Sequence, residues 1–229
     1  MSETKKTTAQ ELNEVQAIKQ AKDFWGKYSK PVTYIGSAVI LLAGGWLAYK
    51  YFVMAPKEKK ANEAISRAQM YFAKDSLDLA LNGDGAGAGF LKIMKNFSGT
   101  DAANLSHYYA GAIYLRKDDF KNAIKHLQDF STNATQIQSA AWRMLGDALM
   151  SDGKKEEGAS YYEKAGKLNA DDEVSSSENL FRAGLAYETL GKNEKAAELY
   201  KIIKEKYPKS EKGFVVDKYL ARLGVIIND

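Results

Sequence analysis

Residues 142–165, WRMLGDALMSDGKKEEGASYYEKA, contain the pattern that decides the fold. Small and large residues stand at regular positions on both sides of Gly153, as in two helices that pack closely across a short turn. The small residues let the helices approach each other, the large residues fill the space between them, and Gly153 permits the turn. This stretch therefore predicts a helical hairpin.

The same pattern occurs three times in the chain. Gly111, Gly146 and Gly184 mark corresponding positions, and the extra residues of the longer second spacing fall in 169–173. The matching residues are Gly111, Tyr114, Phe120, Ala123 and Leu127; then Trp142, Leu145, Gly146, Gly153, Gly158, Tyr162 and Ala165; then Gly184, Tyr187, Gly191, Ala196, Tyr200 and Pro208. A fixed period near 34 residues indicates a helical repeat array.

These positions resemble those of the tetratricopeptide repeat. The resemblance predicts an all-α fold in which a single transmembrane helix precedes a tetratricopeptide-repeat solenoid. The expected repeats are residues 104–137, 139–172 and 177–210, followed by a capping helix at 213–225, within a domain at 56–229. Thr135 to Gln138 and Ser175 to Glu178 are interpreted as the capping boxes that start two of the helices.

Ahead of the repeats, the apolar periodicity predicts a long helix over 57–81 and a shorter one over 90–97. The glycine-rich stretch 82–89 lies between them. It has neither the preceding strand of a dinucleotide fingerprint nor the Gly-Lys-Ser/Thr ending of a P-loop, so we expect a flexible loop.

Residues 31–49, PVTYIGSAVILLAGGWLAY, carry no charge and reach roughly 28 Å as a helix. We predict a transmembrane anchor over 31–55, bounded by the interface residues Trp25, Tyr28, Trp46, Tyr49 and Lys50. A buried core helix would not need aromatic residues and lysines at both ends. A cleavable signal peptide would need a shorter leading segment and a small-x-small site, and neither is present.

The head, residues 1–30, is expected to form a short amphipathic helix at the bilayer surface, with a break at Pro31. A helix that docks on a partner protein fits the same pattern. Lysines and arginine flank the anchor equally on both sides, so the charge rule does not decide the topology. We expect the head in the cytoplasm and the repeat domain in the periplasm, because an uncleaved anchor behind a short charged head commonly exports the longer C-terminal part.

Composition excludes several classes of function. The chain has no cysteine and two histidines, which argues against disulfides, zinc fingers, thiol catalysis and a histidine-built metal site. Most of the net charge of +4 lies in the head and anchor, so a nucleic-acid-binding domain is not indicated. No catalytic constellation is evident, and we expect no enzyme activity, cofactor, metal or small-molecule substrate.

The tetratricopeptide resemblance implies a concave binding surface formed by the first helix of each repeat. The inner-face positions carried over are Tyr108, Ala112, Leu115 and Arg116, then Arg143, Asp147 and Met150, then Phe181, Leu185 and Glu188. This mixture suits an extended or helical protein segment. It departs from the clamp that binds a chaperone's terminal carboxylate, because Asp147 occupies one of the positions that need a cation or amide.

The layout of basic head, single anchor and tetratricopeptide domain resembles the ancillary SecYEG translocon subunit family of bacterial inner membranes. The segment Tyr207 to Ser210 is also similar to repeats of periplasmic envelope proteins. The resemblance implies a single-pass inner-membrane protein whose partners are translocon subunits, secreted polypeptides or periplasmic chaperones. The alternative is a scaffold of another envelope assembly, in outer-membrane biogenesis, cell division or secretion.

Overall fold

The computed structural model describes the backbone of residues 3–225 and the side chains of residues 14–225. The described residues are helical and contain no strand, which confirms the all-α prediction. They form two compact units, residues 1–56 and residues 57–229, which we describe separately. Residues 1–2 of the predicted head and 226–229 of the predicted repeat domain lie outside the described residues.

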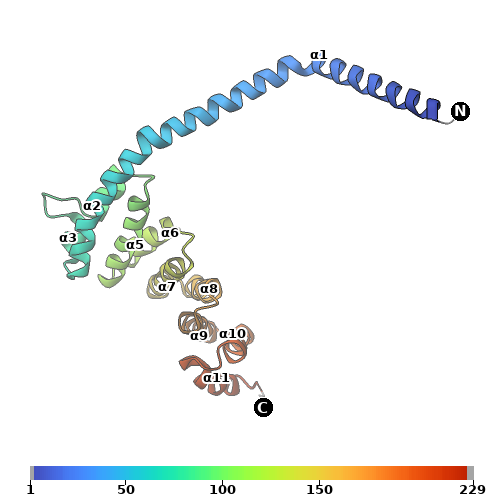
Figure 1. Cartoon of the computed structure of the whole chain (residues 1–229). Helices are drawn as coiled ribbons and strands as arrows, with labels where there is room; N and C mark the ends of the chain where they lie inside the picture. The colour runs from blue at the N-terminus through green and yellow to red at the C-terminus, as the bar shows by residue number, and fades with distance from the viewer. Residues whose placement is uncertain (1–2, 226–229) are drawn as a thin grey trace. The chain divides into compact units, whose positions relative to one another are not determined.

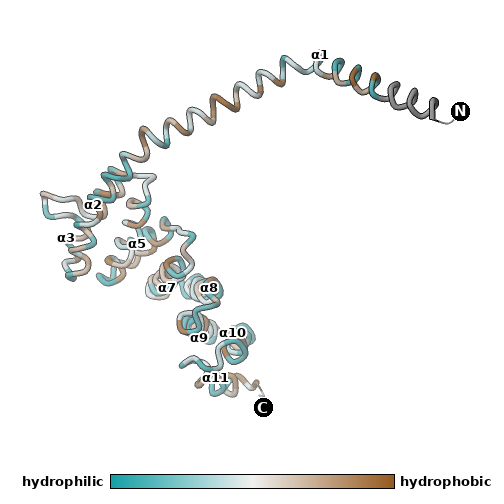
Figure 2. The backbone as a smooth tube through the Cα atoms, in the orientation of Figure 1, coloured by the Kyte–Doolittle hydropathy of each residue, from teal (hydrophilic) through white to brown (hydrophobic). Residues whose placement is uncertain are grey.

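Helix α1 (Glu3–Tyr49) contains the apolar stretch. Its large apolar side chains are exposed, with Leu41 and Leu42 each 75% accessible, and brown apolar residues gather in the middle of the helix in Figure 2. Among the described residues, one helix is long and apolar enough to cross a membrane, and it buries none of its apolar window. Its length and composition suit a membrane span or a signal anchor.

The predicted break at Pro31 is not observed, because α1 continues through this residue. A proline inside a helix leaves a carbonyl one turn earlier without its backbone donor. Thr33 donates its hydroxyl to the carbonyl of Ser29 at 2.7 Å, a side-chain bond of the kind that satisfies backbone groups near such positions. The head and the anchor therefore belong to one helix.

A π-helical turn, η1 (Lys50–Met54), follows α1 and leads into α2 (Ala55–Ala73) (Figure 1). The backbone N–H of Ala55 donates to the carbonyl of Lys50, five residues earlier. Pro56 directly follows this π-helical turn, and the helical run continues through the proline into α2.

The helix predicted over 57–81 is divided in two. Asp75 adopts a left-handed conformation with φ of 59°, which ends α2, and α3 (Leu77–Asn82) then begins. A single left-handed residue of this kind is tolerated by Asp but interrupts a helix. The helix predicted over 90–97 is confirmed as α4 (Phe90–Asn96).

The glycine-rich loop between α3 and α4 is held in place rather than open. The carboxylate of Asp84 accepts backbone N–H bonds from Ala86 and Gly87, at 3.1 and 2.6 Å, and the hydroxyl of Tyr71 at 2.7 Å. A Cβ at Gly89 would lie 2.3 Å from the backbone nitrogen of Gly83, so the two ends of the loop touch. Gly83 and Gly89 permit this close backbone approach, so the loop is held by specific contacts, which differs from the flexible loop expected.

Three antiparallel helix pairs and a final helix follow (Figure 1). The pairs are α5 (Asp101–Arg116) with α6 (Phe120–Asp129), α7 (Thr135–Ser151) with α8 (Lys155–Leu168), and α9 (Glu173–Thr189) with α10 (Asn193–Lys206); α11 (Glu211–Arg222) is the last element. Each pair packs against the next, as in a solenoid.

In each pair the two helices contact each other at a glycine of the first helix. A Cβ added at Gly146 would lie 2.6 Å from the ring of Tyr162, and one added at Gly184 would lie 2.4 Å from the ring of Tyr200. In the first pair the large residue at this contact is Leu127, against Gly111. The small-and-large pattern of the sequence therefore marks the real contacts between paired helices.

The two predicted capping boxes are wrong. The cap of α9 is Asp172, whose carboxylate accepts the N–H of Ser175, so Ser175 lies inside the helix. At α7 the capping position is Ala134, which offers no side-chain acceptor, and Gln138 instead accepts the N–H of Thr132 at 2.8 Å. Asp and Ser are both favoured at helix caps, and the cap of α9 is Asp172, three positions before the predicted Ser175.

Candidate functional site

The inner-face residues expected on α5 divide into packed and exposed groups. Ala112 is buried, and Leu115 is partly buried against the core of the first two pairs. Tyr108 lies half-buried with its ring 5.3 Å from that of Phe130, and burial raises its pKa. Arg116 is exposed and pairs with Asp75 at 2.5 Å. On this helix the expected surface is therefore largely made of packing residues.

On α7, the expected residues Arg143 and Asp147 lie one turn apart and form an ion pair at 3.3 Å. Asp147 also accepts the hydroxyl of Tyr162 from α8 at 2.7 Å. Burial and this hydrogen bond raise the pKa of Tyr162, so the tyrosine stays protonated as a donor. Met150 is partly buried against the core of the third pair.

On α9, the expected groove residue Phe181 is buried, and this prediction needs correction. Its ring lies 4.7 Å from that of Tyr219 on α11, in an edge-to-face arrangement, and the ammonium of Lys212 lies 5.3 Å from its centre. The capping helix covers the position, so Phe181 is part of the core and offers no surface to a partner. Leu185 packs partly into the same core.

Glu188, the last expected inner-face residue, is engaged within the protein. It accepts the hydroxyl of Tyr200 at 2.5 Å and forms two contacts with the guanidinium of Arg222, at 2.7 and 2.9 Å. Burial and the bond to Glu188 raise the pKa of Tyr200. This carboxylate therefore joins three helices and does not present a free charge.

A continuous series of charges crosses the first helices of the last two pairs and α11. We call it the polar ladder: Arg143, Asp147, Arg182, Glu178 and Lys212. The contacts beyond the first ion pair are 3.4 Å from Arg182 to Asp147, 2.6 Å from Arg182 to Glu178, and 3.2 Å from Lys212 to Glu178. Burial raises the pKa of Glu178, but hydrogen bonds from Arg182 and Lys212 outweigh it and hold the pKa below its usual value. The ladder pairs cations with carboxylates along its whole length.

A depression of about 260 Å³ lies beside this ladder between α7 and α9. Its lining includes Gln136, Ala140, Arg143, Val174, Glu178 and Asn179. Val174 is 76% exposed, and Asn179 is 2% exposed. The Oδ1 atom of Asn179 is buried and accepts no hydrogen bond from any residue that the structure describes. An unpaired buried acceptor of this kind carries a desolvation cost of about 1–3 kcal/mol until a donor reaches it.

Sequence reasoning missed Asn179. The available signal was the run Ser175 to Asn179, five consecutive polar residues inside a helix, where the corresponding turns of α5 and α7 mix polar and apolar residues. Ser176 and Ser177 in this run are buried, so the polarity belongs to an interior and not to a solvated face. Of the ten expected residues, Arg143 alone lines the depression.

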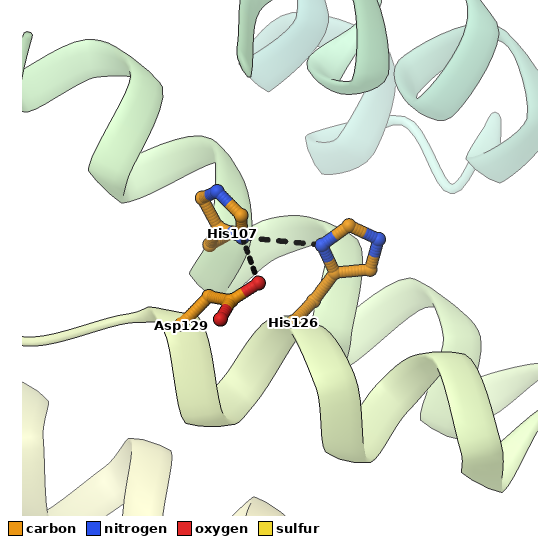
Figure 3. Close-up of side chains that lie close together, drawn as sticks. All are labelled: His107, His126 and Asp129. Atoms are coloured by element: carbon orange, nitrogen blue, oxygen red, sulfur yellow. Dashed lines mark hydrogen bonds and ion pairs between the residues drawn. The ribbon is translucent and has the colours of Figure 1, made fainter. Parts of the chain in front are cut away.

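The two histidines, treated as ordinary helix residues from the sequence, lie together with Asp129 between α5 and α6 (Figure 3). The Nδ1 atoms of His107 and His126 are 3.2 Å apart, and Asp129 Oδ2 is 3.7 Å from His107 Nδ1. Burial, with the nearby charges of His107 and Lys125, lowers the pKa of His126 to about 4, although Asp129 acts in the opposite direction. Burial also lowers the pKa of His107. Both rings are therefore neutral at pH 7.

The residues expected at a membrane interface lie on α1 and at the start of η1. Trp25, Tyr28, Trp46 and Tyr49 are exposed or nearly so, as side chains that contact lipid would be. The ammonium of Lys50 lies 5.2 Å from the ring of Trp46, a cation–π distance. The two groups of aromatic residues flank the apolar window at both of its ends.

Comparison with known families identifies two parts of the chain. The tetratricopeptide repeat family matches residues 139–172, which contain most of α7 and all of α8, and residues 178–210, which contain most of α9 and all of α10. No curated protein matches the chain. Proteins built from this repeat bind other proteins and are generally scaffolds without catalytic activity.

Proposed function

We propose that this chain is a membrane-anchored protein that binds segments of other proteins, because residues 139–172 and 178–210 match the tetratricopeptide repeat family. The helix α1 would hold it in the bilayer, and the depression between α7 and α9 would receive the bound segment. The observation that carries this proposal is the depression itself, which lies beside the polar ladder and is lined by the exposed Val174 and by Asn179.

The chemistry of the depression favours an extended segment with few charges. Asn179 Oδ1 lacks a donor, and a backbone N–H of a bound chain would supply one if the Asn179 side chain turns toward the depression. Such an N–H is present in every sequence except at proline. Val174 offers an exposed apolar contact beside it. The three cations of the polar ladder are paired with its two carboxylates and with Glu211, which also contacts Lys212, so neither a strongly acidic nor a strongly basic segment gains by binding here.

The finer assignment is an accessory of the Sec translocon, with the repeat domain in the periplasm and the head in the cytoplasm. The resemblance of the domain order to the ancillary SecYEG subunit family supports it. In this role the protein would hold emerging secreted polypeptides or pass them to periplasmic chaperones. The alternative is a scaffold of another cell-envelope assembly, in which the same surface binds one fixed partner.

The binding surface is tested by photocrosslinking in intact cells from a probe at Val174, with a matched probe at the exposed Glu198 of α10. We expect capture of translocon subunits, chaperones or many secreted chains from Val174 alone. One stoichiometric envelope partner would establish the scaffold instead. Equal capture from both positions would contradict binding at the inner face.

A second variant separates binding from folding. Asn179→Leu removes the unpaired acceptor, so the free energy of unfolding should stay the same or rise slightly, whereas capture from Val174 should fall several-fold. The thermal unfolding midpoint is measured first to establish that the variant folds, and Asn179→Ala, which removes the same acceptor without added bulk, is the alternative. Unchanged capture by folded Asn179→Leu would contradict the role of this residue.

The topology is tested by single-cysteine labelling, for which a chain without cysteine is well suited. Lys19→Cys and Asn133→Cys place a thiol on each side of the apolar stretch, at exposed positions. A maleimide that does not cross the inner membrane should label Asn133→Cys and not Lys19→Cys in cells with a permeable outer membrane. The reverse pattern would place the repeat domain in the cytoplasm.

A further inference from the structure

The cluster of His107, His126 and Asp129 occupies positions where the other two helix pairs carry different chemistry. His107 precedes the contact glycine by four residues, and His126 precedes the contact residue Leu127 by one. The residues at the corresponding positions are Trp142, Tyr161 and Lys164 in the second pair, and Leu180, Leu199 and Ile202 in the third. The fold does not require histidine at this place, since aromatic and aliphatic residues fill it elsewhere in the same chain.

The distances within the cluster match those of a metal site (Figure 3). Zinc binds imidazole nitrogen at about 2.0–2.1 Å, so two ligands in a tetrahedron are roughly 3.3 Å apart. The two Nδ1 atoms are separated by 3.2 Å. One ligand atom from each of the three residues lies within 4.8 Å of the others. Asp129 is exposed, so its carboxylate is free to move the short distance that coordination needs.

We propose that His107 Nδ1, His126 Nδ1 and the carboxylate of Asp129 form a binding site for a divalent transition-metal ion of the zinc class. Three protein ligands leave a fourth position for water. The ion would join α5 to α6 within the first helix pair. The carboxylate would offset its charge and that of Lys125, whose ammonium also acts on the two rings.

The competing explanation is a simple hydrogen bond between the two imidazoles. In that arrangement one ring carries a proton on Nδ1 and donates it to the other. In the metal-bound arrangement both protons lie on Nε2, and Asp129 becomes a ligand instead of a neighbouring charge. The two explanations therefore differ in the importance of Asp129 and in the effect of added metal.

The test is a zinc titration of the full-length chain in mild detergent, by competition with a chromophoric chelator. We expect one ion per chain, and at least tenfold weaker binding by Asp129→Asn and by His107→Gln. Glu198→Gln, which removes an exposed carboxylate from α10, is the matched control and should bind like the unmodified chain. Cobalt in place of zinc should give the absorption of a tetrahedral site.

Stability gives an independent readout. Saturating zinc should raise the thermal unfolding midpoint of the unmodified chain and of Glu198→Gln, but not that of His107→Leu/His126→Leu, which carries the residues of the third pair. If the histidine pair does not tolerate leucine, Asp129→Asn serves alone, because its side chain is exposed. Absence of zinc binding to the unmodified chain, or binding by Asp129→Asn and His107→Gln that is as tight as that of the unmodified chain, would overturn the proposal.

Discussion

The first helix pair and the two that follow it solve the same packing problem with different chemistry. In the second and third pairs a tyrosine ring fills the space over the glycine, and its hydroxyl donates to a carboxylate of the partner helix, Asp147 or Glu188. In the first pair Leu127 fills that space and has no hydroxyl. The polar contact between its helices is the histidine pair, one residue away along α6. Packing and polar contact are therefore separable within one repeat.

The turns differ in the same way. Gly153 and Gly191 adopt positive φ values of 83° and 71° between paired helices, and Asp118 takes this position in the first pair with φ of 58°. A residue with a side chain tolerates this conformation less well than glycine, although Asp is among the better ones. The first pair thus departs from the pattern at its contact and at its turn. The family matches begin only at the second pair.

The largest expected difference between the third and the first helix pair concerns the side chain that fills the space over the glycine. Tyr200→Ala should lower the free energy of unfolding by about 4 kcal/mol, because it empties the space of a side chain that is fully buried. Leu127→Ala should cost about 3 kcal/mol, since a smaller group is lost from a similarly buried site. Urea unfolding of the full chain in mild detergent measures both. A smaller loss for Tyr200→Ala than for Leu127→Ala would show that the glycine contact is not the main support of the third pair.

The histidine pair should make the stability of the first helix pair depend on pH. His126 has a pKa of about 4 when folded, against about 6.5 when unfolded, so the unfolded chain takes up the proton first as the pH falls. Stability is complete above pH 6.5 and is lost as the pH falls toward 4, by about 2 kcal/mol between pH 7 and pH 5. Urea unfolding at a series of pH values measures this loss. A chelator is present throughout, so that bound metal does not contribute.

The groups that face His126 in this measurement are His107, Lys125 and Asp129. The variant His126→Leu should lose most of this dependence, because leucine does not titrate; a smaller part remains from His107, whose pKa burial also lowers. The carboxylates with lowered pKa, such as Glu178, lose their contribution only below their own unfolded pKa, near pH 4.5. An equal loss between pH 7 and pH 5 in His126→Leu would assign the effect to other groups.

The smallest effect concerns the tyrosine hydroxyl. Tyr162→Phe keeps the ring over Gly146 and removes only the bond to Asp147, so unfolding should become easier by about 1 kcal/mol. Asp147 retains Arg143 and Arg182, which limits the loss. Urea unfolding beside Leu127→Met, which changes an apolar group at the matching position, provides the comparison. A cost of several kcal/mol would mean that the hydroxyl and not the ring defines this repeat.

Much of the fold could be predicted from the sequence, because its main contacts join helices that are neighbours in the chain. The contacts Gly146 with Tyr162 and Gly184 with Tyr200 join helices that are neighbours in the chain, and each leaves a small-and-large signature. The burial of Phe181 left none, because the ring that covers it belongs to α11, outside the repeated unit. The left-handed Asp75 was equally invisible, since Asp is also common on helix surfaces.

The candidate sites were harder to predict, and for a different reason. His107 and His126 come together only when the register of α5 against α6 is known, and the contact of Gly111 with Leu127 supplies that register. The polar ladder needs side-chain positions from α7, α9 and α11 at once. Family positions indicated which helices face inward, but not which charges were already paired.

The aromatic cluster of Phe181, Tyr200 and Tyr219 also has a bearing on the order in which the chain matures during synthesis. Its three rings come from α9, α10 and α11, so it closes only after Tyr219 has been made. The contact of Gly111 with Leu127 is complete long before, from residues that leave the ribosome earlier. We therefore expect the first helix pair to form before the third during synthesis, and the rings of Phe181 and Tyr200 to stay exposed until α11 has been made.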